Sequence, residues 1–302
     1  MELSVIIVSY NVKSLVVDCL NSVFAAGSNI DLEVFLVDNA SVDGTIEEVQ
    51  KRFSNVSIIS NNHNFGFPKA NNQALKVSSG EVILLLNPDT VLQLDALSEL
   101  VGFFHNHREG AVVGMNVRNR DGSRQYSTHG VLTIKSLLFS KYRYRNRTES
   151  WFDSNQIIRV GYVSGSALAF NRTVYKHLGG LDEDLFWMED VDFCYRAYKI
   201  GFPIYFLPNS VVTHFVGESA KTNIRRVLFH QHVSRVKFFK KHYNRVVTKL
   251  VEILIFTELC GKIIVRSSQW LIPSKRLDSY NRLCGYMAAF CFIVGKRSPI
   301  WS

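Results

Sequence analysis

Short apolar runs alternate with amphipathic stretches through the first 120 residues, and this alternation constrains the fold more than any other feature. The apolar runs at 4–10, 32–37, 56–60 and 82–86 have the length of buried strands. After the first run, apolar residues from Leu15 to Phe24 recur at helical spacing, and Pro68 can occupy the first turn of a later helix. Repeated strand–helix units predict the α/β class, with a Rossmann-like, mostly parallel sheet flanked by helices.

Polar residues follow each predicted strand. Ligands of open α/β sheets bind beside the carboxyl ends of the strands, so we expect a binding site at that edge. Its residues would be Ser9, Tyr10 and Asn11 after the first strand, Asp38 and Asn39 after the second, Asn61 after the third, and Asn87 and Asp89 after the fourth. Beside it, Asn64, Gly66 and Asn71 surround a tight turn where glycine lets the backbone approach a phosphate, although a plain loop is the alternative.

A second group of polar side chains lies in the segment 179–196, GGLDEDLFWMEDVDFCYR. Apolar residues at helical spacing, followed by Gly201 and Pro203 as stop signals, predict a helix that begins at the acidic part. The positive end of the helix dipole favours ionised carboxylates there, the form that a general base needs. The acids are Glu189, Asp190 and Asp192, and Asp192 can pair with Arg196 one turn later. Alternatively, the acids only cap and solvate the helix.

The composition, with 47% hydrophobic residues among 302, suffices for one large domain or for one domain with an appendage. The five cysteines are scattered without a CxxC pair, which favours a reduced, cytoplasmic compartment. The N-terminal sequence MELSVIIVSYN has no basic leader and is interpreted as a strand, not as a signal peptide.

Charge divides the chain into two parts. Residues 1–220 contain 19 Lys and Arg against 23 Asp and Glu, a balance of −4, whereas residues 221–302 contain 16 against 3, a balance of +13, which together give +9. We therefore expect a binding and catalytic domain at 1–220 and a basic, amphipathic helical tail at 221–302.

The tail contains two apolar blocks, at 246–265 and 286–295. The first carries four charged residues and the second is ten residues long, so neither is a clean membrane span. Helices lying on an anionic membrane, with Trp270 and Trp301 at the head groups, fit this pattern. A helical appendage packed on the main domain, or on a second copy in a homodimer, fits it equally. No nucleic acid is expected as a partner, because no recognised binding motif accompanies the basic stretch 237–245.

Between the two polar regions, residues 118–159 are polar, basic and aromatic, with KYRYRNRTESWF at 141–152. They are interpreted as a loop that closes over a donor or guides an acceptor, or as a solvated insertion without function.

Seven motifs give the chain a family resemblance. It resembles the family 2 glycosyltransferases, inverting enzymes of the type A fold, and within them the bacterial rhamnosyltransferase-like branch. The matching pieces, in family order, are VSYN (8–11), VDNASVDGT (37–45), NFGFPKANN (64–72), LLNPDT (85–90), VSGSALAF (163–170), GGLDEDLFWMEDVDFCYR (179–196) and HFVGES (214–219).

The resemblance implies a role for each motif in binding a nucleotide sugar, linked to dTDP or UDP. Asp38 would accept a hydrogen bond from N3–H of uracil or thymine, although an Asx turn is the alternative. Ser9, Tyr10 and Asn11 would border the same base, with Tyr10 equally possible in the core. The turn of Asn64, Gly66 and Asn71 would face the diphosphate.

The resemblance also implies a divalent cation, Mn²⁺ or Mg²⁺, bound by Asp89 with His214 nearby. Asn87 would face the sugar or ribose. It replaces the first aspartate of the commoner Asp-x-Asp motif.

The implied reaction is transfer with inversion, most simply of rhamnose from dTDP-rhamnose to a polysaccharide or lipid-linked acceptor. Asp190 would be the base, with Glu189 as the second candidate. Trp187, Asp192 and Arg196 would contact the acceptor or sugar, although Trp187 and its neighbour Phe186 could instead pack in a core. A UDP-hexose donor and a noncatalytic binding module are the alternatives. The enzyme would act in the cytoplasm, peripherally on the inner face of the cell membrane. A processive synthase is disfavoured because its QxxRW motif is missing.

Overall fold

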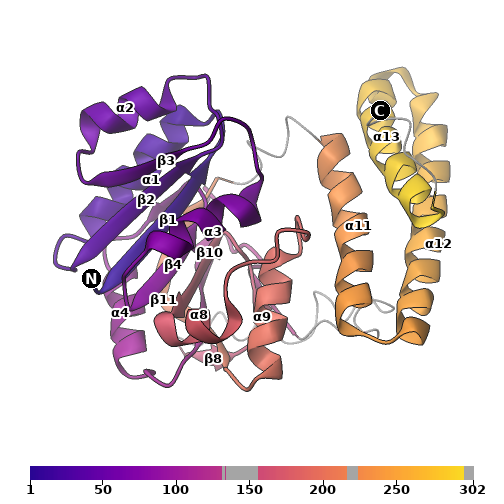
Figure 1. Ribbon diagram of the computed structural model, residues 1–302. Coiled ribbons are helices and arrows are strands. Elements are labelled where there is room, and N and C mark those ends of the chain that lie inside the picture. Colours follow the sequence, from indigo (N-terminus) through magenta and orange to yellow (C-terminus); the bar gives the residue numbers. More distant parts are fainter. Residues whose placement is uncertain (131–132, 134–155, 216–223, 296–302) are drawn as a thin grey trace. The chain divides into compact units, whose positions relative to one another are not determined.

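The computed structural model describes residues 1–130, 133, 156–215 and 224–295 (Figure 1). They form two compact units. The first contains residues 1–130, 156–183 and 189–215, and the second contains residues 133, 184–188 and 224–295. The predicted boundary after residue 220 lies among residues 216–223, outside the described part of the chain.

The first unit is built on a mixed sheet, which has nine strands among the described residues. The four predicted strands are present to within one residue at either end, as β1 (Leu3–Ser9), β2 (Leu32–Asp38), β3 (Val56–Ser60) and β4 (Val82–Leu86). They are adjacent and parallel in the order β3-β2-β1-β4. The predicted α/β class is therefore confirmed.

The other half of the sheet contains antiparallel pairs. Its strands are β10 (Ala167–Asn171), β6 (Val112–Arg118), β11 (Ile204–His214), β5 (Thr90–Leu92) and β8 (Ile158–Arg159). β10 lies antiparallel between β4 and β6, and β11 pairs parallel with β6 and antiparallel with β5. A small second sheet pairs β7 (Thr128–His129) with β9 (Tyr162–Val163).

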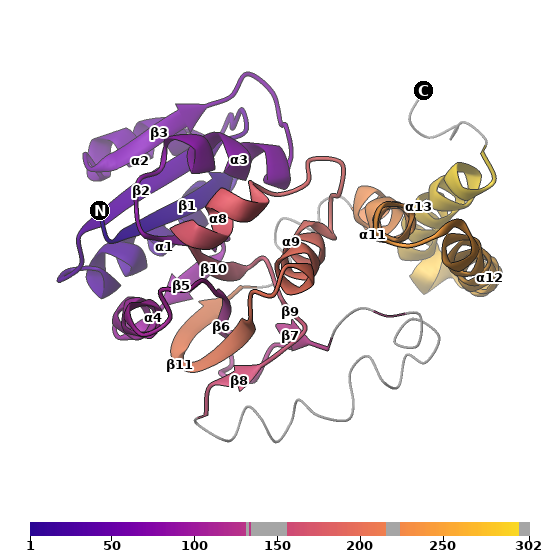
Figure 2. The ribbon, with the colours of Figure 1, turned by 60° about the horizontal axis from the view of Figure 1, so that its bottom comes forward.

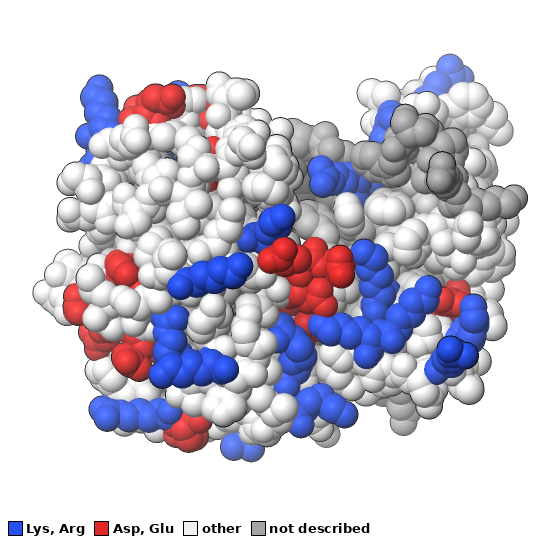
Figure 3. All heavy atoms as spheres, in the orientation of Figure 1, with Lys and Arg blue, Asp and Glu red and all other residues white. Residues whose placement is uncertain are grey.

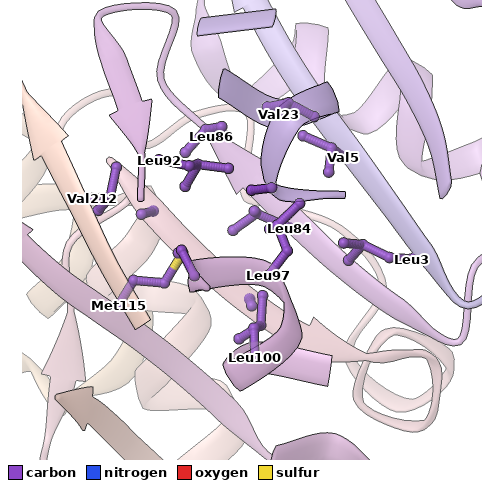
Figure 4. Close-up of a cluster of buried hydrophobic side chains, with 14 of the residues drawn as sticks. Leu3, Val5, Val23, Leu84, Leu86, Leu92, Leu97, Leu100, Met115 and Val212 are labelled. Atoms are coloured by element: carbon purple, nitrogen blue, oxygen red, sulfur yellow. The ribbon is translucent and has the colours of Figure 1, made fainter. Parts of the chain in front are cut away.

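Helices cover both faces of the sheet (Figure 1). Alternate residues of β1 face opposite sides: Leu3, Val5 and Ile7 join one buried cluster and Ile6 and Val8 the other. The first cluster includes residues from α1 (Lys13–Ala26), α2 (Thr45–Arg52) and α4 (Ala96–His105), and Figure 4 shows its centre. The second includes residues from α3 (Phe67–Val77), α8 (Arg172–Leu178) and α9 (Glu189–Lys199). Because its strands are buried on both sides, the sheet is a rigid support for its polar edge.

The starts of α3 and α9 agree with the sequence prediction. Pro68 lies in the first turn of α3, and the three acids of α9 occupy its first turn. α9 ends at Lys199, just before the predicted stop signals.

The second unit contains three helices that lie side by side, α11 (Ile224–His242), α12 (Arg245–Trp270) and α13 (Arg276–Ile293), with a short 3₁₀ turn at Pro273–Lys275 (Figures 1 and 2). Both predicted apolar blocks are helical. Buried aromatic and aliphatic residues, among them Phe238, Phe239, Ile255 and Leu259, form its core. Lys and Arg side chains stand on its surface (Figure 3). Within the described part of the chain, no helix is long and apolar enough to cross a membrane.

Candidate active site

The ends of β1 and β2 meet at Asp38. Ser9 lies opposite Asp38 in the parallel register, and its hydroxyl donates a hydrogen bond of 2.7 Å to Asp38 Oδ2. Ser41 donates to the same carboxylate twice, from its N–H to Oδ1 (2.8 Å) and from its hydroxyl to Oδ2 (2.6 Å). Asp38 therefore accepts from the backbone three residues later, a local turn close to the Asx turn that was the alternative to base binding. Because a carboxylate oxygen has two lone pairs, Oδ1 keeps one for a further donor such as a base N–H.

Two residues after β1 stand at the surface. Tyr10 is 49% exposed, so it is not part of the core. Asn11 has a left-handed backbone (φ 54°), which asparagine tolerates better than most residues. Its Oδ1 accepts a hydrogen bond from Val42 N–H and its N–H donates to Ser41 Oγ. Asn11 therefore fixes the loop that surrounds Asp38.

The Gly66 turn precedes α3 as predicted. Asn64 Oδ1 accepts a hydrogen bond of 2.9 Å from Gly66 N–H, and Gly66 has φ 84°, a conformation that glycine adopts without strain. Asn71 is buried and donates to Phe67 O, whereas its Oδ1 has no hydrogen-bond partner among the described residues. An acceptor without a donor suits a hydroxyl or a water molecule better than a phosphate oxygen.

Asn39, one of the polar residues expected at the strand ends, connects this turn to them. Its side chain donates to Gly66 O (3.5 Å) and accepts from Asn61 Nδ2 (3.0 Å). Asn61 and Gln73 exchange two hydrogen bonds of 2.9 and 2.8 Å, which extend the network to α3. Asn39 was expected there because it lies directly after Asp38, at the exit of a buried strand.

The predicted metal ligands come together. β5 and β11 pair antiparallel with His214 opposite Thr90, and this register places His214 Nε2 3.1 Å from Asp89 Oδ1. Asn87 Nδ2 lies 3.4 Å from the same imidazole nitrogen. Asp89 and His214 are both buried. Asp89 and His214 are two such side chains, and no group of three or more His, Cys, Asp and Glu side chains gathers as a metal site anywhere in the described residues.

The contacts of His214 fit a cation. Its Nδ1 lies 3.0 Å from Gln125 Oε1, and its Nε2 faces Asp89 Oδ1. With a proton on Nδ1, the lone pair of Nε2 and the Asp89 carboxylate would be directed at one ion, whereas a protonated ring would pair with Asp89 directly. Two ligands about 2.1 Å from one ion and at a right angle are about 3.0 Å apart, so the spacing suits a shared ion. Gln125 was missed because a neutral amide in the predicted loop 118–159 carries no charge or spacing that marks it. Residues 131–132 and 134–155 of that loop lie outside the described part of the chain.

The predicted base, Asp190, lies in the first turn of α9 and is partly buried. Its carboxylate accepts hydrogen bonds from Gly165 N–H (2.8 Å) and Val191 N–H (2.7 Å). Burial raises the pKa of Asp190, and the two N–H donors oppose that rise. A raised pKa gives a carboxylate a higher proton affinity, which a general base needs.

One turn joins Asp190 to the region of Asn87. The turn at 164–166, between β9 and β10, donates from Gly165 N–H to Asp190, while Ser166 O accepts a hydrogen bond of 3.0 Å from Asn87 N–H. The carboxylate of α9 and the end of β4 are therefore two hydrogen bonds from one another through this turn. Gly165 was not singled out because it acts through its backbone.

Asp192 and Arg196 form the predicted pair, with a distance of 2.7 Å. Asp192 is fully buried, and the other two nitrogens of Arg196 donate to Leu178 O and Gly180 O. In this structure the pair ties α9 to the loop before it. The expected contact of Asp192 and Arg196 with an acceptor stays a prediction.

Asn72 of α3 forms hydrogen bonds with the loop between α8 and α9, at Leu181 and Glu183. It exchanges hydrogen bonds with Leu181 and donates to Glu183 Oε1 (3.0 Å). A Cβ on Gly180 would lie 2.1 Å from Asn72 Oδ1, so only glycine allows this approach.

Trp187 lies three residues before Asp190 and is 42% exposed, which excludes the alternative of core packing. Phe186 is half-buried, with its ring 4.8 Å from that of His230 in α11.

Curated proteins similar to the chain include two rhamnosyltransferases. The N-acetylglucosaminyl-diphospho-decaprenol L-rhamnosyltransferase of Mycobacterium tuberculosis is 24% identical over 234 residues, which cover 70% of this chain and 76% of the relative. The O-antigen chain rhamnosyltransferase RfbN of Salmonella typhimurium is 25% identical over 218 residues, covering 71% and 66%.

Solved structures share the fold. A mannosyltransferase from Pyrobaculum calidifontis, in complex with GDP-Man and Mn²⁺, gives a TM-score of 0.60 at 16% identity and covers 97% of this chain and 87% of its own. TarS 1–349 of S. aureus, in complex with UDP-GlcNAc, gives 0.56 at 20% identity and covers 97% and 82%. These likenesses confirm the predicted type A fold.

The sequence also matches the family described as Glycosyl transferase family 2 over residues 4–179. That match spans more than half of the 302 residues, so the chain belongs to glycosyl transferase family 2 and is a glycosyltransferase.

Proposed function

We propose that this glycosyltransferase moves rhamnose from dTDP-rhamnose to a polysaccharide or lipid-linked glycan, with inversion at the transferred carbon. The observation that carries the proposal is the 164–166 turn, which is bonded both to Asp190 and to the end of β4, where the cation ligands follow. The two curated relatives described above are rhamnosyltransferases, and the name of one specifies a decaprenol-linked sugar.

The proposed reaction is a direct displacement. An acceptor hydroxyl gives its proton to the Asp190 carboxylate while its oxygen forms a bond to C1 of the donor sugar. The bond from C1 to the diphosphate oxygen breaks, and the nucleoside diphosphate leaves with the electron pair. Asp38 would accept a hydrogen bond from the base, and the amides at Gly66 would face the diphosphate. Glu189 remains the second candidate for the base.

Asp89 and His214 would hold Mn²⁺ or Mg²⁺, with Asn87 beside them. When bound, the ion supplies positive charge that stabilises the leaving diphosphate. The distance of 3.1 Å between Asp89 Oδ1 and His214 Nε2, which suits two ligands of one ion, supports this assignment.

A panel of nucleotide sugars tests the donor. Thermal-shift measurements with Mn²⁺ should give the largest stabilisation with dTDP-rhamnose, because the matching donor alone combines base, diphosphate and sugar contacts. A larger shift with a UDP-hexose would assign that donor instead. Binding without transfer or hydrolysis of any donor would support a noncatalytic module.

Asp190→Asn tests the base. The substitution should lower kcat about 10²–10⁴-fold, the usual contribution of a general base, while the donor-induced thermal shift stays near that of the unsubstituted enzyme. Glu189→Gln is the matched control, with a smaller loss expected. Retained turnover in Asp190→Asn, together with loss in Glu189→Gln, would transfer the role to Glu189.

We further propose that the basic C-terminal helices bind an anionic membrane surface, on the inner face of the cell membrane, where a lipid-linked acceptor is held. The charge of +13 over residues 221–302 supports an anionic partner more than a homodimer, because two copies of this surface repel each other.

A further inference from the structure

The segment 184–188 leads directly into α9, and its backbone is fixed by one face of α11. Ser234 Oγ donates a hydrogen bond of 2.5 Å to Phe186 O, and Lys237 Nζ donates one of 3.0 Å to Asp184 O. The ring of His230 lies 4.8 Å from the ring of Phe186. Positions 230, 234 and 237 recur at i, i+4 and i+7, so they share one face of the helix.

The backbone at Trp187 is strained. Its φ is 82°, in the left-handed region that a bulky aromatic residue rarely adopts. Such a conformation persists only where surrounding contacts enforce it, and it occurs often at ligand sites. Phe186 O belongs to the same peptide plane as Trp187 N, about which this φ is measured. The hydrogen bond from buried Ser234 therefore acts directly on the strained torsion.

The contact between His230 and Phe186 does not require a protonated histidine. Burial, together with the positive charges of Arg226 and Lys237, lowers the pKa of His230 to about 4. The ring is therefore neutral at neutral pH and packs on Phe186 as an aromatic surface. The packing of His230 on Phe186 should therefore stay the same between pH 6 and pH 8.

Trp187 stays close to the base in the chain. Asp190 is three positions further along the chain, and an extended chain spans at most about 3.5 Å per residue, so their Cα atoms lie within about 11 Å. Trp187 is 42% exposed. This leaves apolar surface of its indole in water, where a bound ligand could cover it. An exposed aromatic residue in an enforced backbone, near a base, suits the apolar face of a sugar ring.

We infer that Ser234 is a positioning residue, which with Lys237 and His230 keeps Trp187 in the orientation that binds the acceptor sugar. The inference rests on the proposed function, because it assigns the indole to the acceptor of that reaction. It gives the C-terminal helices a part in acceptor selection, separate from any binding to a membrane.

A double-mutant cycle tests the inference. Ser234→Ala should raise the KM for the acceptor about 5-fold, the effect of one typical hydrogen bond, and leave the KM for the donor unchanged. Trp187→Gly, which removes the ring and relieves the strain, should raise the acceptor KM at least as much. Ser234→Ala should then have no further effect in the Trp187→Gly background, because both act through one indole. Ser268→Ala, which loses a hydroxyl bonded only to Val265 O of its own helix, is the matched control.

Two results would overturn the inference. One is a double mutant whose increase in acceptor KM is the product of the increases in the two single mutants. Independent effects would indicate that Ser234 has a general structural role. The other is an unchanged acceptor KM in Ser234→Ala.

Hydrogen exchange separates this inference from the proposed function. Amides at 184–188 should exchange faster in Ser234→Ala than in Ser268→Ala, whether or not a donor is identified. If no nucleotide sugar is turned over, the proposed function fails, and unchanged exchange in Ser234→Ala would then overturn the inference as well.

Discussion

At the scale of single residues, the environment of Asp190 predicts the pH dependence of the reaction. Burial raises the pKa of this carboxyl group above its ordinary value of 3.8. A base acts in its ionised form, so kcat/KM should fall as the pH drops through that raised pKa, and the acidic limb should lie above pH 3.8. The measurement is a pH profile of kcat/KM with circular dichroism at each pH to show that the protein stays folded. An acidic limb that persists unchanged in the residual activity of Asp190→Asn would assign it to another group.

The residues that the sequence identified and those that it missed differ in how they act. Asp38, Asp89 and His214 carry ionisable groups directly at strand ends, so a regular pattern marks them. Gly165 acts through its N–H and Gln125 through the tautomer of an imidazole, and neither leaves a charge or a spacing to recognise. The burial of Asp192 could not be predicted, because the carbonyl groups that anchor its partner Arg196 are 16 and 18 residues away in the sequence.

At the scale of elements, local patterns predicted the parallel strands and α9, whereas the antiparallel half of the sheet could not be predicted. β10 lies between β4 and β6 although at least 48 residues separate it from either strand, and pairing at that distance has no periodic signal. The charged residues in the apolar block 246–265 were also ambiguous. The structure shows that Glu258 and Lys262 lie in an ion network with Arg235 of α11, and that they therefore join two helices.

The environment of Glu258 predicts how the stability of α11 and α12 depends on pH. Burial alone would raise its pKa, but the hydrogen bond from His232 and the charges of Arg235 and Lys262 hold the pKa of Glu258 well below its usual range. A lowered carboxyl pKa adds stability above the unfolded value of 4.5, and this stability is lost as the pH falls below it. Glu258→Gln should cost about 2 kcal/mol at pH 7, less than a fully buried ion pair because the side chain is 34% exposed.

The measurement for Glu258→Gln is hydrogen exchange of α11 and α12, which reports the local free energy of opening. Asp278→Asn is the matched control, since Asp278 is 55% exposed and its two arginine partners are at the surface. Its expected cost is below about 0.5 kcal/mol. Equal exchange in the two variants would show that the network does not hold α11 and α12 together.

At the scale of the whole molecule, the C-terminal helices combine positive charge with exposed apolar side chains. On α12, Val246, Leu250, Ile253 and Ile264 are exposed, and their spacing of four, three and eleven residues places them on one side of the helix. The connection to α13 continues this surface with Leu271 and Leu277, which are 71% and 75% exposed. Lys275 and Arg276 lie between them and are exposed, whereas the nearby acid Asp278 is already paired with Arg266 and Arg282. Such a surface is typical of helices that lie in a membrane interface.

This arrangement predicts binding to anionic vesicles through the connection between α12 and α13. Sedimentation with vesicles containing phosphatidylglycerol should recover the protein, and vesicles of phosphatidylcholine alone should recover less. Lys275→Glu with Arg276→Glu should weaken partitioning at least about 30-fold, because each basic residue at an anionic surface contributes about 1 kcal/mol. Leu271→Ser with Leu277→Ser should weaken binding to both kinds of vesicle, since it removes apolar area from the interface.

Leu94→Ser is the matched control for that experiment, because Leu94 is 71% exposed but belongs to the first unit. It should leave vesicle binding unchanged. A homodimer is the competing use of the same surface, and sedimentation equilibrium separates the two. Self-association that Leu271→Ser with Leu277→Ser abolishes, together with no recovery on anionic vesicles, would assign the surface to a second copy of the chain. Binding to anionic lipid by a monomer, lost at high salt, would assign it to the membrane, since screening weakens attraction between exposed charges.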